Sequence, residues 1–255
     1  MTNAPTTRVL KIGGRAQNDP RLAPAIRNAA AGEGIVVVHG GGDEVSALQR
    51  RLGLTPTFHG GRRVTTAADL EIVQMVLSGS ANKRLVSALV TAGVRAVGIS
   101  GEDDALLVAR ATARDTFGEV GEPSRVDTRL LSLLVSAGYI PVVSPLARDE
   151  VTGATLNVNG DDAAAEIAIA LGADELVLIA DVPGVMADNA VIPELDVERA
   201  ATLIENGTAR DGMAAKLQAA RRAVERGVPR VRVGNIVAIE SAAAGTVITL
   251  SPTVV

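Results

Sequence analysis

Short apolar runs alternate along this chain with longer amphipathic segments that are rich in alanine. Most of the short runs are continuous stretches of Val, Ile and Leu, as expected for strands that are buried on both faces of a sheet. Strands are predicted over residues 8–12, 35–38, 96–99, 140–143, 175–179, 230–233 and 246–250, and helices over 20–31, 43–52, 66–78, 80–93, 126–137, 160–171, 196–205 and 212–226. This alternation predicts an α/β fold with a largely parallel sheet and helices on both faces.

Two regions depart from this rhythm. The stretch "TPTFHGGRRVT", residues 55–65, predicts a turn or hairpin that projects from the sheet. Residues 104–125 and 148–156 predict short strands and turns, which we interpret as a small antiparallel patch. We expect a short polar tail over residues 1–7 and two lobes on one continuous sheet, 8–172 and 173–255, with a soft boundary between them.

Composition excludes several classes of function. Apolar residues make up 47% of the 255 residues but aromatic residues only 1%, so stacking platforms for single-stranded nucleic acid are missing. The net charge of −4 and the lack of a long basic run argue against nucleic acid and membrane partners. The chain has no cysteine, which excludes disulfides, thiolate metal sites and cysteine nucleophiles, and its two histidines cannot form a His-rich metal site.

The first residues, "MTNAPTT", lack the apolar segment of a signal peptide. No stretch approaches the roughly 18 uncharged apolar residues of a membrane span. We therefore expect a cytoplasmic protein.

Three predicted strands end in turns suited to an anion. They are Lys11-Ile12-Gly13-Gly14, His39-Gly40-Gly41-Gly42 and Asp181-Val182-Pro183-Gly184-Val185. Ligands of open α/β sheets lie at the carboxyl ends of the strands, where glycine lets backbone N–H groups approach an anion. The chain contains no Gly-Lys pair, so a Walker-type loop is absent, and Val45 breaks the dinucleotide fingerprint after Gly40 and Gly42. A bound nucleotide must be held in another way, and a dehydrogenase is disfavoured.

The chain uses 22 arginines but only three lysines, Lys11, Lys83 and Lys216. A lysine is a compact point charge, whereas an arginine is a wide planar fork. A phosphoryl group in flight needs point charges close to its oxygens, so Lys11 and Lys216 are candidates to converge on one glycine-lined pocket. Lys83 is interpreted as a surface or helix-packing residue.

Polar residues crowd the segment "TLNVNGDD", residues 155–162. Asn159 predicts an N-cap, and acids in the first helical turn favour the helix dipole. Capping does not need both Asp161 and Asp162, so we expect one of them to organise the two lysines, although the pattern does not tell which. Asn157 is a candidate ligand for a substrate carboxylate.

The adjacent arginines of "HGGRRVT" suit bidentate recognition of a carboxylate. A solvated arginine pair would give the same pattern. Thr65 or Thr66 together with Asp69 predicts a helix cap rather than a site.

Six motifs in chain order resemble the amino-acid kinase family: K-x-G-G from Lys11, V-H-G-G-G from Val38, G-x-R-V-T from Gly61, N-V-N-x-D from Asn157, A-D-V-x-G-V from Ala180 and D-G-M-x-x-K from Asp211. The likeness extends from about residue 8 to 249 and is greatest to the branch that phosphorylates N-acetyl-L-glutamate. It implies a three-layer αβα sandwich around a mainly parallel open sheet, the carbamate kinase-like fold. It also implies transfer of the ATP γ-phosphoryl group to a side-chain carboxylate, in arginine biosynthesis.

The resemblance also implies roles for individual residues. Lys11 and Lys216 would stabilise the transferring phosphoryl group, and Asp161 would orient them. The backbone of Gly13, Gly14 and Gly41 would bind phosphate oxygens. The acyl amino acid would be bound by Gly41, Gly42, Arg63 and Asn157, of which Arg63 and Asn157 would bind its α-carboxylate. The nucleotide would be bound by Asp181, Val182, Pro183, Gly184, Val185, Met186, Thr208, Ala209 and Arg210.

Further implications concern cofactor and assembly. Mg²⁺ would accompany ATP through the phosphates, with no metal site of protein ligands. The lobe 8–172 would bind the acyl amino acid and form the dimer, and the lobe 173–255 would bind ATP. Family members that arginine inhibits carry a long N-terminal helix, so the short stretch before residue 8 implies an arginine-insensitive homodimer.

Four positions depart from the family pattern. Arg15 follows the double glycine, Gly160 replaces a common alanine, Pro183 lies inside the nucleotide turn, and Asp162 doubles the key aspartate. Two alternatives stay open. One is a sister kinase for another N-acylated or carrier-linked amino acid, such as an aminoadipate of lysine biosynthesis. The other is an amino-acid sensor of the same fold without turnover.

Overall fold

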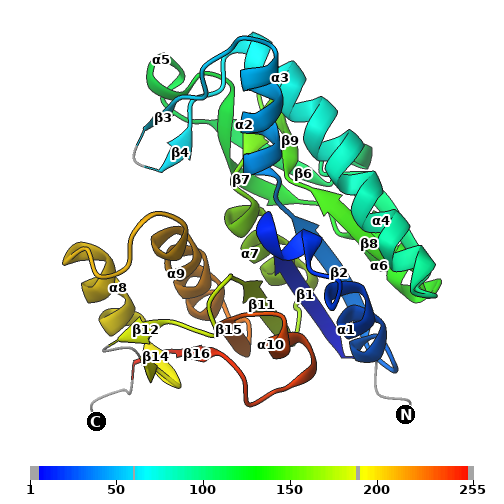
Figure 1. Cartoon of the computed structure of the whole chain (residues 1–255), viewed down its shortest axis with the longest axis vertical. Coiled ribbons are helices and arrows are strands. Elements are labelled where there is room, and N and C mark those ends of the chain that lie inside the picture. Colours follow the sequence, from blue (N-terminus) through cyan, green and yellow to red (C-terminus); the bar gives the residue numbers. More distant parts are fainter. Residues whose placement is uncertain (1–5, 60, 188–189, 252–255) are drawn as a thin grey trace.

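A central sheet runs through the computed structural model, which describes residues 6–59, 61–187 and 190–251. Within these ranges it has eight strands in the order β14 (Glu194–Asp196), β16 (Thr246–Thr249), β15 (Arg230–Gly234), β11 (Glu175–Ile179), β1 (Thr7–Ile12), β2 (Gly34–His39), β8 (Ile140–Ser144) and β5 (Ala96–Ser100) (Figure 1). Of the predicted tail, residues 1–5 lie outside the described ranges. The seven predicted strands are confirmed, whereas β14 at the sheet edge was not predicted.

The sheet is mainly parallel, as predicted. Neighbouring strands from β5 to β15 all run in the same direction, and β16 is antiparallel to β15 but parallel to β14. The chain moves outward from β1 through β2 to one side and later places β11 and β15 on the other side of β1. Strand order thus reverses next to β1, and the crevice at such a reversal is where open α/β sheets bind ligands.

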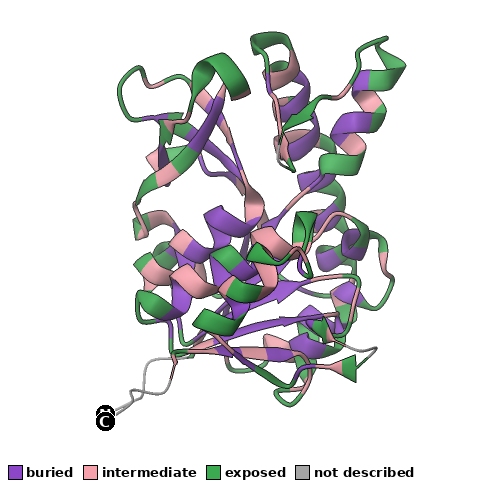
Figure 2. Ribbon diagram, turned by 90° about the vertical axis from the view of Figure 1, so that its left-hand side faces the viewer, coloured by how far each residue is buried: buried purple, intermediate pink, exposed green. Residues whose placement is uncertain are grey.

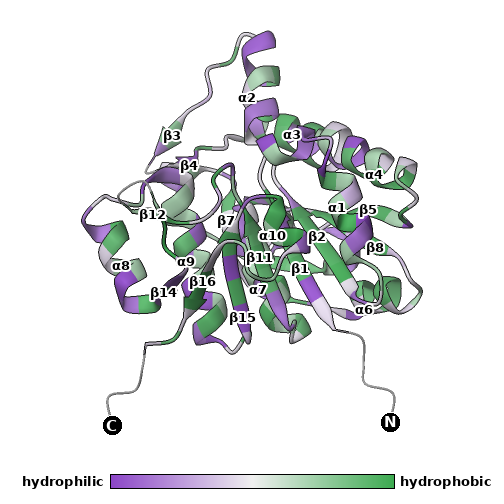
Figure 3. Ribbon diagram, turned by 60° about the horizontal axis from the view of Figure 1, so that its bottom comes forward, coloured by the Kyte–Doolittle hydropathy of each residue, from purple (hydrophilic) through white to green (hydrophobic). Residues whose placement is uncertain are grey.

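Helices cover both faces of this sheet and confirm the three-layer αβα architecture. One face packs against α1 (Leu22–Ala29), α4 (Asn82–Thr91) and α10 (Val237–Glu240), and the other against α6 (Arg129–Ser136), α7 (Gly160–Leu171) and α9 (Asp211–Glu225). Figure 2 shows the strands buried between these layers, and Figure 3 shows that the strands are apolar along most of their length. None of the helices in the described ranges is long and apolar enough to cross a membrane.

Side-chain alternation along β1 decides where Lys11 points. Leu10 and Ile12 belong to the core under α1, whereas Val9 belongs to the core under α7 and α9. Because successive side chains of a strand point to opposite faces, Lys11 lies on the same face as Val9. The strand therefore presents its lysine to α7 and α9 at its carboxyl end.

The region predicted as a small antiparallel patch is a closed four-stranded barrel of mixed direction. Its strands are β6 (Leu107–Ala111), β7 (Val120–Val126), β9 (Leu146–Asp149) and β10 (Thr155–Val158). The pairs β6–β7 and β9–β10 are antiparallel, but β7–β10 and β6–β9 are parallel. The prediction was wrong about direction because closing the barrel pairs strands that are distant in sequence.

The hairpin predicted in 55–65 is confirmed as β3 (Phe58–His59) and β4 (Arg62–Arg63), which project beside α2 (Gly42–Arg51) (Figure 1). The helices predicted over 66–78 and 80–93 form one helical run of α3 (Ala67–Gln74), the π-helical turn η2 (Met75–Ala81) and α4. Thr66 caps α3 in a reciprocal pair with Asp69, as predicted.

The remaining elements are short, apart from α8 (Val197–Glu205), which was predicted. Those not predicted are η1 (Arg15–Asn18), η3 (Asp103–Ala105), α5 (Arg114–Phe117), β12 (Met186–Ala187) and β13 (Ala190–Val191). Elements of two to four residues bury too few side chains to leave a readable period in the sequence.

His39 at the end of β2 is fully buried and belongs to a polar network beneath the site. Its Nδ1 lies 2.8 Å from the carbonyl oxygen of Gly40, and its Nε2 lies 3.1 Å from Nδ2 of Asn82, which also donates to Val142 O. These contacts assign a neutral ring that donates from Nδ1 and accepts at Nε2. Burial lowers the pKa of His39 to about 4.

This network makes stability depend on pH. The unfolded chain binds a proton on His39 below about pH 6.5, but the folded chain does so only near pH 4, so the free energy of unfolding falls as the pH decreases across that window. The expected slope from this group is about 1.4 kcal/mol per pH unit. A His59→Gln variant leaves one imidazole, whose Cε1–H resonance should keep its neutral position from pH 8 to about pH 5. A titration midpoint above pH 6 would contradict the assignment.

Candidate active site

Two lysines and one carboxylate meet at the carboxyl end of β1. Nζ of Lys11 lies 2.9 Å from Oδ1 of Asp161, and Nζ of Lys216 lies 3.1 Å from the same oxygen and 3.4 Å from Oδ2. All three residues are at most 8% exposed. The structure thus brings together three residues predicted for the site, which are contributed by β1, α7 and α9.

The cluster carries one positive charge more than its carboxylate can balance. Burial would raise the pKa of Asp161, but the charges and hydrogen bonds of Lys11 and Lys216 outweigh burial and lower it, so Asp161 is ionised. Burial and the charge of Lys11 lower the pKa of Lys216 to about 8. A second anion placed against the lysines would relieve this imbalance, as an opposite charge favours the protonated lysines.

Local structure at the start of α7 fixes the carboxylate. The Oδ1 atom of Asn159 accepts from the backbone N–H groups of Asp161 and Asp162, so Asn159 is the N-cap, as predicted. Asp161 then lies in the first turn, where the helix dipole also favours a negative charge. Cap and dipole together hold the Asp161 carboxylate toward β1.

The two adjacent aspartates have different partners. Asp161 contacts both lysines, whereas Oδ1 of Asp162 accepts from Arg222 of α9 at 2.5 Å and its Oδ2 lies 3.8 Å from Arg62. The question that the sequence left open is therefore settled geometrically, because only Asp161 is in contact with the lysines.

Glycines leave space around the cluster. A Cβ atom added to Gly160 would lie 3.3 Å from Cε of Lys11, which is tighter than an ordinary contact. A Cβ added to Gly14 would meet no atom within 4 Å, so the backbone of this turn is open, while one at Gly13 would lie 3.3 Å from Ile179 O. Gly160, where the family pattern has alanine, therefore gives the Lys11 side chain room at the floor of the site.

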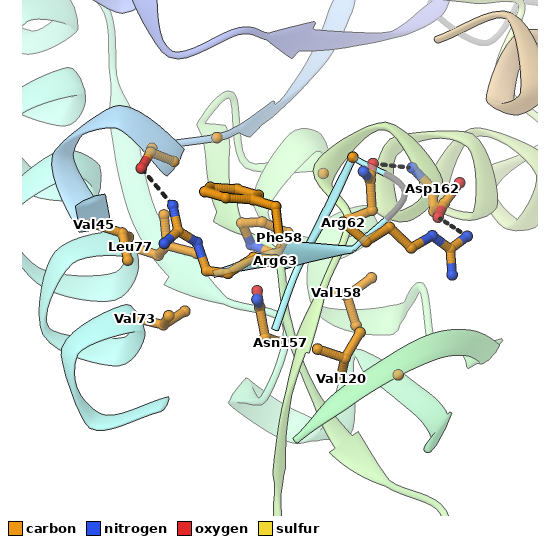
Figure 4. Close-up of a pocket in the computed structure, with 18 residues that line it drawn as sticks. Val45, Phe58, Arg62, Arg63, Val73, Leu77, Val120, Asn157, Val158 and Asp162 are labelled. Carbon is orange, nitrogen blue, oxygen red and sulfur yellow. Dashed lines mark hydrogen bonds and ion pairs between the residues drawn. The ribbon is translucent and has the colours of Figure 1, made fainter. Parts of the chain in front are cut away.

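A cavity of about 220 Å³ opens beside the cluster, between the hairpin and the end of the sheet. Predicted residues Gly41, Gly42, Arg63 and Asn157 line it, with Gly160 and Asp162 on the side of α7 (Figure 4). Sequence analysis missed its apolar wall, which consists of Val45, Phe58, Val73, Leu77, Val120 and Val158. Phe58 in this wall is 53% exposed. The chain has only two phenylalanines, and this scarcity is the one sequence signal that could have identified Phe58.

Arg63 is a cation held by neutral groups. Its guanidinium donates to Gln49 Oε1 (2.6 Å), Ser46 Oγ (2.7 Å) and Gly42 O (2.8 Å), and it stacks on Phe58 at 4.7 Å. In the described part of the chain no carboxylate oxygen lies within ion-pair distance of it, and burial lowers its pKa. Arg63 is therefore preorganised to receive a carboxylate that the protein itself does not supply.

Asn157 lies on β10 and also lines the cavity. Its Nδ2 donates to Oγ1 of the buried Thr65 at 3.1 Å, which fixes the amide. The structure thus places Arg63 and Asn157 around one space, consistent with the pairing expected from the sequence.

A second, mainly apolar cavity of about 170 Å³ lies near the carboxyl end of β11. It is lined by five residues predicted for a nucleotide, Val182, Val185, Met186, Thr208 and Ala209, and by Leu203 and Met213, which sequence analysis missed. Four other predicted residues do not line it. Asp181 faces solvent near Arg15, Pro183 is exposed at a neighbouring hollow, and Arg210 donates to Gly207 O before α9. Gly184 packs so closely on Thr246 and Val191 that no Cβ would fit.

Arg15 lies between the two cavities. Its side chain is 78% exposed, with Nη1 3.5 Å from Oδ2 of Asp181 and Nε 3.8 Å from Oδ2 of Asp43. Ion pairs of this length and exposure contribute little to stability. Nothing in these contacts explains why arginine replaces the small residue of the family pattern.

Comparisons with known proteins agree with this fold. Residues 6–235 match the Amino acid kinase family. The acetylglutamate kinase of Chloroflexus aurantiacus strain J-10-fl is 42% identical over 236 residues, which cover 91% of this chain and 92% of that protein. Among solved structures, smu.665 from Streptococcus mutans UA159 has a TM-score of 0.87 and 29% identity, covering 95% of this chain and 98% of that one. Carbamate kinase from Giardia lamblia bound to AMP-PNP has a TM-score of 0.73 and 17% identity, covering 97% and 99%, so it is similar in fold.

The charge balance of the cluster generates a prediction. An Asp161→Asn variant would leave two buried lysines without an anion, so its free energy of unfolding should fall by roughly 3–5 kcal/mol, measured by urea denaturation. The triple variant Lys11→Met, Asp161→Leu, Lys216→Met removes all three charges and should recover most of that loss. A loss below about 1 kcal/mol for Asp161→Asn would mean that the carboxylate does not balance the lysines.

Proposed function

Because the chain belongs to the amino acid kinase family, we propose that it transfers the γ-phosphoryl group of ATP to the side-chain carboxylate of N-acetyl-L-glutamate, in arginine biosynthesis. The product is N-acetyl-L-glutamyl 5-phosphate. One observation carries the proposal. The excess positive charge on Lys11 and Lys216 lies beside the same cavity as Arg63, whose partners among the described residues are neutral. The likeness to acetylglutamate kinases supports the identity of the acid.

The acyl amino acid has two carboxylates, and the site has two positions for negative charge. In this proposal the α-carboxylate binds Arg63 and Asn157, with backbone groups of Gly41 and Gly42 nearby. The apolar wall of Val45, Val73 and Leu77 then receives the N-acyl group. The side-chain carboxylate is left to extend toward Gly160, behind which Lys11 lies.

In the transfer step, an oxygen of the side-chain carboxylate forms a bond to the γ-phosphorus, and the bond from that phosphorus to the β,γ-bridging oxygen breaks. ADP leaves with the electron pair. The carboxylate is already ionised, so no general base is needed, and Lys11 and Lys216 stay protonated while they stabilise charge on the phosphoryl oxygens. Asp161 positions both lysines throughout. Catalysis then rests on orientation and electrostatic stabilisation.

The nucleotide would occupy the space from the Gly13–Gly14 turn to the apolar cavity near β11. The lining of that cavity suits the flat face of a nucleotide base, and it consists of Val182, Val185, Met186, Thr208 and Ala209 together with Leu203 and Met213. We assign Asp181, Pro183, Gly184 and Arg210 to the same nucleotide segment. Mg²⁺ would be held by phosphate oxygens and would neutralise part of their charge. Among the described residues no group of three or more acidic or histidine side chains could hold a metal ion.

The two proposed lobes correspond to the two proposed binding regions, one for the acyl amino acid and one for the nucleotide. Residues 8–172 would bind the acyl amino acid and carry the dimer contacts, and residues 173–255 would bind ATP and supply Lys216. By resemblance to the family we also propose a cytoplasmic homodimer. The alternatives of another acylated acid or a ligand sensor are separated by the assay below.

The proposal is tested by trapping the product. Hydroxylamine converts an acyl phosphate into a hydroxamate, so the purified chain is incubated with ATP, Mg²⁺, hydroxylamine and one acid at a time. Hydroxamate is expected with N-acetyl-L-glutamate and not with glutamate, aspartate or N-acetyl-aminoadipate. Product with N-acetyl-aminoadipate alone would reassign the substrate, and ATP binding without any product would favour a sensor.

A second prediction concerns the choice of lysine. Lys11→Arg and Lys216→Arg should each lower kcat by about a hundredfold or more while the circular dichroism spectrum is unchanged, because a broader cation does not fit against the phosphoryl oxygens. The matched control is Lys83→Arg, since Lys83 donates to Gly98 O away from the site and should tolerate the change. A kcat within threefold of the original in either site variant would remove that lysine from the proposed mechanism.

A further inference from the structure

The two arginines of the hairpin have opposite environments. Arg63 contacts neutral acceptors, whereas Arg62 faces two carboxylates, with Nη1 2.8 Å from Glu122 of β7 and Nη2 3.8 Å from Asp162 of α7. Figure 4 shows the side chains pointing away from each other, Arg63 toward α2 and Arg62 toward Asp162. Since Arg62 already has anionic partners, its role differs from that of Arg63.

Asp162 connects the hairpin to α9. Its side chain is 11% exposed, and it accepts from Arg222 of α9 at 2.5 Å while Arg62 approaches from the other side. Arg222 also lies 3.5 Å from Glu166, which binds Arg226 at 2.6 Å. Acidic residues of α7 and arginines of α9 thus form a continuous ion-pair network along the two helices.

The backbone of the hairpin also comes close to the start of α9, which supports the connection between the hairpin and α9. A Cβ added to Gly61, at the hairpin turn, would lie 3.9 Å from Cα of Asp211, the first residue of α9. The hairpin therefore reaches the beginning of the helix that carries Lys216. Asp162 follows Asp161 directly, so the position of the hairpin is transmitted to both sides of the lysine cluster.

We propose that Arg62 is a positioning residue which, through Asp162, fastens the substrate hairpin to α7 and α9. This contact holds the carboxylate bound by Arg63 at a fixed distance from Lys11 and Lys216. The inference rests on the function proposed above for these three residues. At 3.8 Å the contact is an ion pair without a direct hydrogen bond.

The kinetic test is a double-mutant cycle of Arg62→Gln and Asp162→Asn. Each single variant should lower kcat with N-acetyl-L-glutamate roughly tenfold to a hundredfold, because a small misplacement of the reacting groups is enough for such a loss. The KM for ATP should change little. Arg62→Gln should leave the Tm nearly unchanged, whereas Asp162→Asn also loses the 2.5 Å pair with Arg222 and should lower the Tm. The double variant should be no slower than the slower single variant, and Arg62→Lys should regain part of the loss.

The matched control is Glu122→Gln, which removes the other, more exposed partner of Arg62 and should leave kcat within about twofold of the original. Losses that multiply in the double variant would overturn the coupling. An equal loss in Glu122→Gln would show that the pair with Asp162 is not the fastening contact.

A readout independent of turnover separates this proposal from the proposed function. The chain has no cysteine, so spin labels can be placed on cysteines introduced at the exposed Thr57 in the hairpin segment and the exposed Gln218 on α9. The distance distribution between them should broaden in Arg62→Gln and stay narrow in Glu122→Gln, whether or not hydroxamate forms in the trapping assay. An unchanged distribution in Arg62→Gln would overturn the inference.

Discussion

One carboxylate held between two buried lysines is the interaction on which the rest of this structure depends. Asp161 lies about 3 Å from Nζ of both Lys11 and Lys216, and all three are almost excluded from solvent. Charges buried in this way are costly unless their geometry is nearly ideal. The asparagine cap and the helix dipole at the start of α7 supply that geometry for the anion. The surplus positive charge that remains would favour a second anion beside the lysines.

The periods of strand and helix bring these groups together from distant parts of the chain. Alternation along β1 turns Lys11 toward α7 and α9, while its neighbours Leu10 and Ile12 fill the core on the other face. The same alternation separates Arg62 from Arg63 in the two-residue strand β4. One arginine therefore stays available for a ligand carboxylate, and the other is bound to carboxylates of the protein.

Local signals were sufficient to predict much of this arrangement. Continuous apolar runs predicted the parallel strands, the Asn159 cap predicted the start of α7, and the scarcity of lysine pointed to Lys11 and Lys216. What could not be predicted depends on contacts between distant segments. The mixed direction of the small barrel, the edge strand β14, and the apolar wall of Val45, Val73 and Leu77 all belong to this group, since none has a period or composition of its own. The choice between Asp161 and Asp162 belongs to this group too, because it depends on their contacts with β1 and α9.

The position of β1 has a consequence for the synthesis of this protein. On one side β1 pairs with β2, which follows closely in the chain, but on the other it pairs with β11, where Arg8 is opposite Glu175. At roughly 5–20 residues per second, a ribosome takes on the order of ten seconds to reach that partner. Until then a strand that is almost entirely buried in the folded protein has an unpaired edge on the nascent chain, and such an edge is prone to pair with other chains. The strand that carries the first lysine of the site is thus also one that waits, with an open edge, for a partner made late in translation.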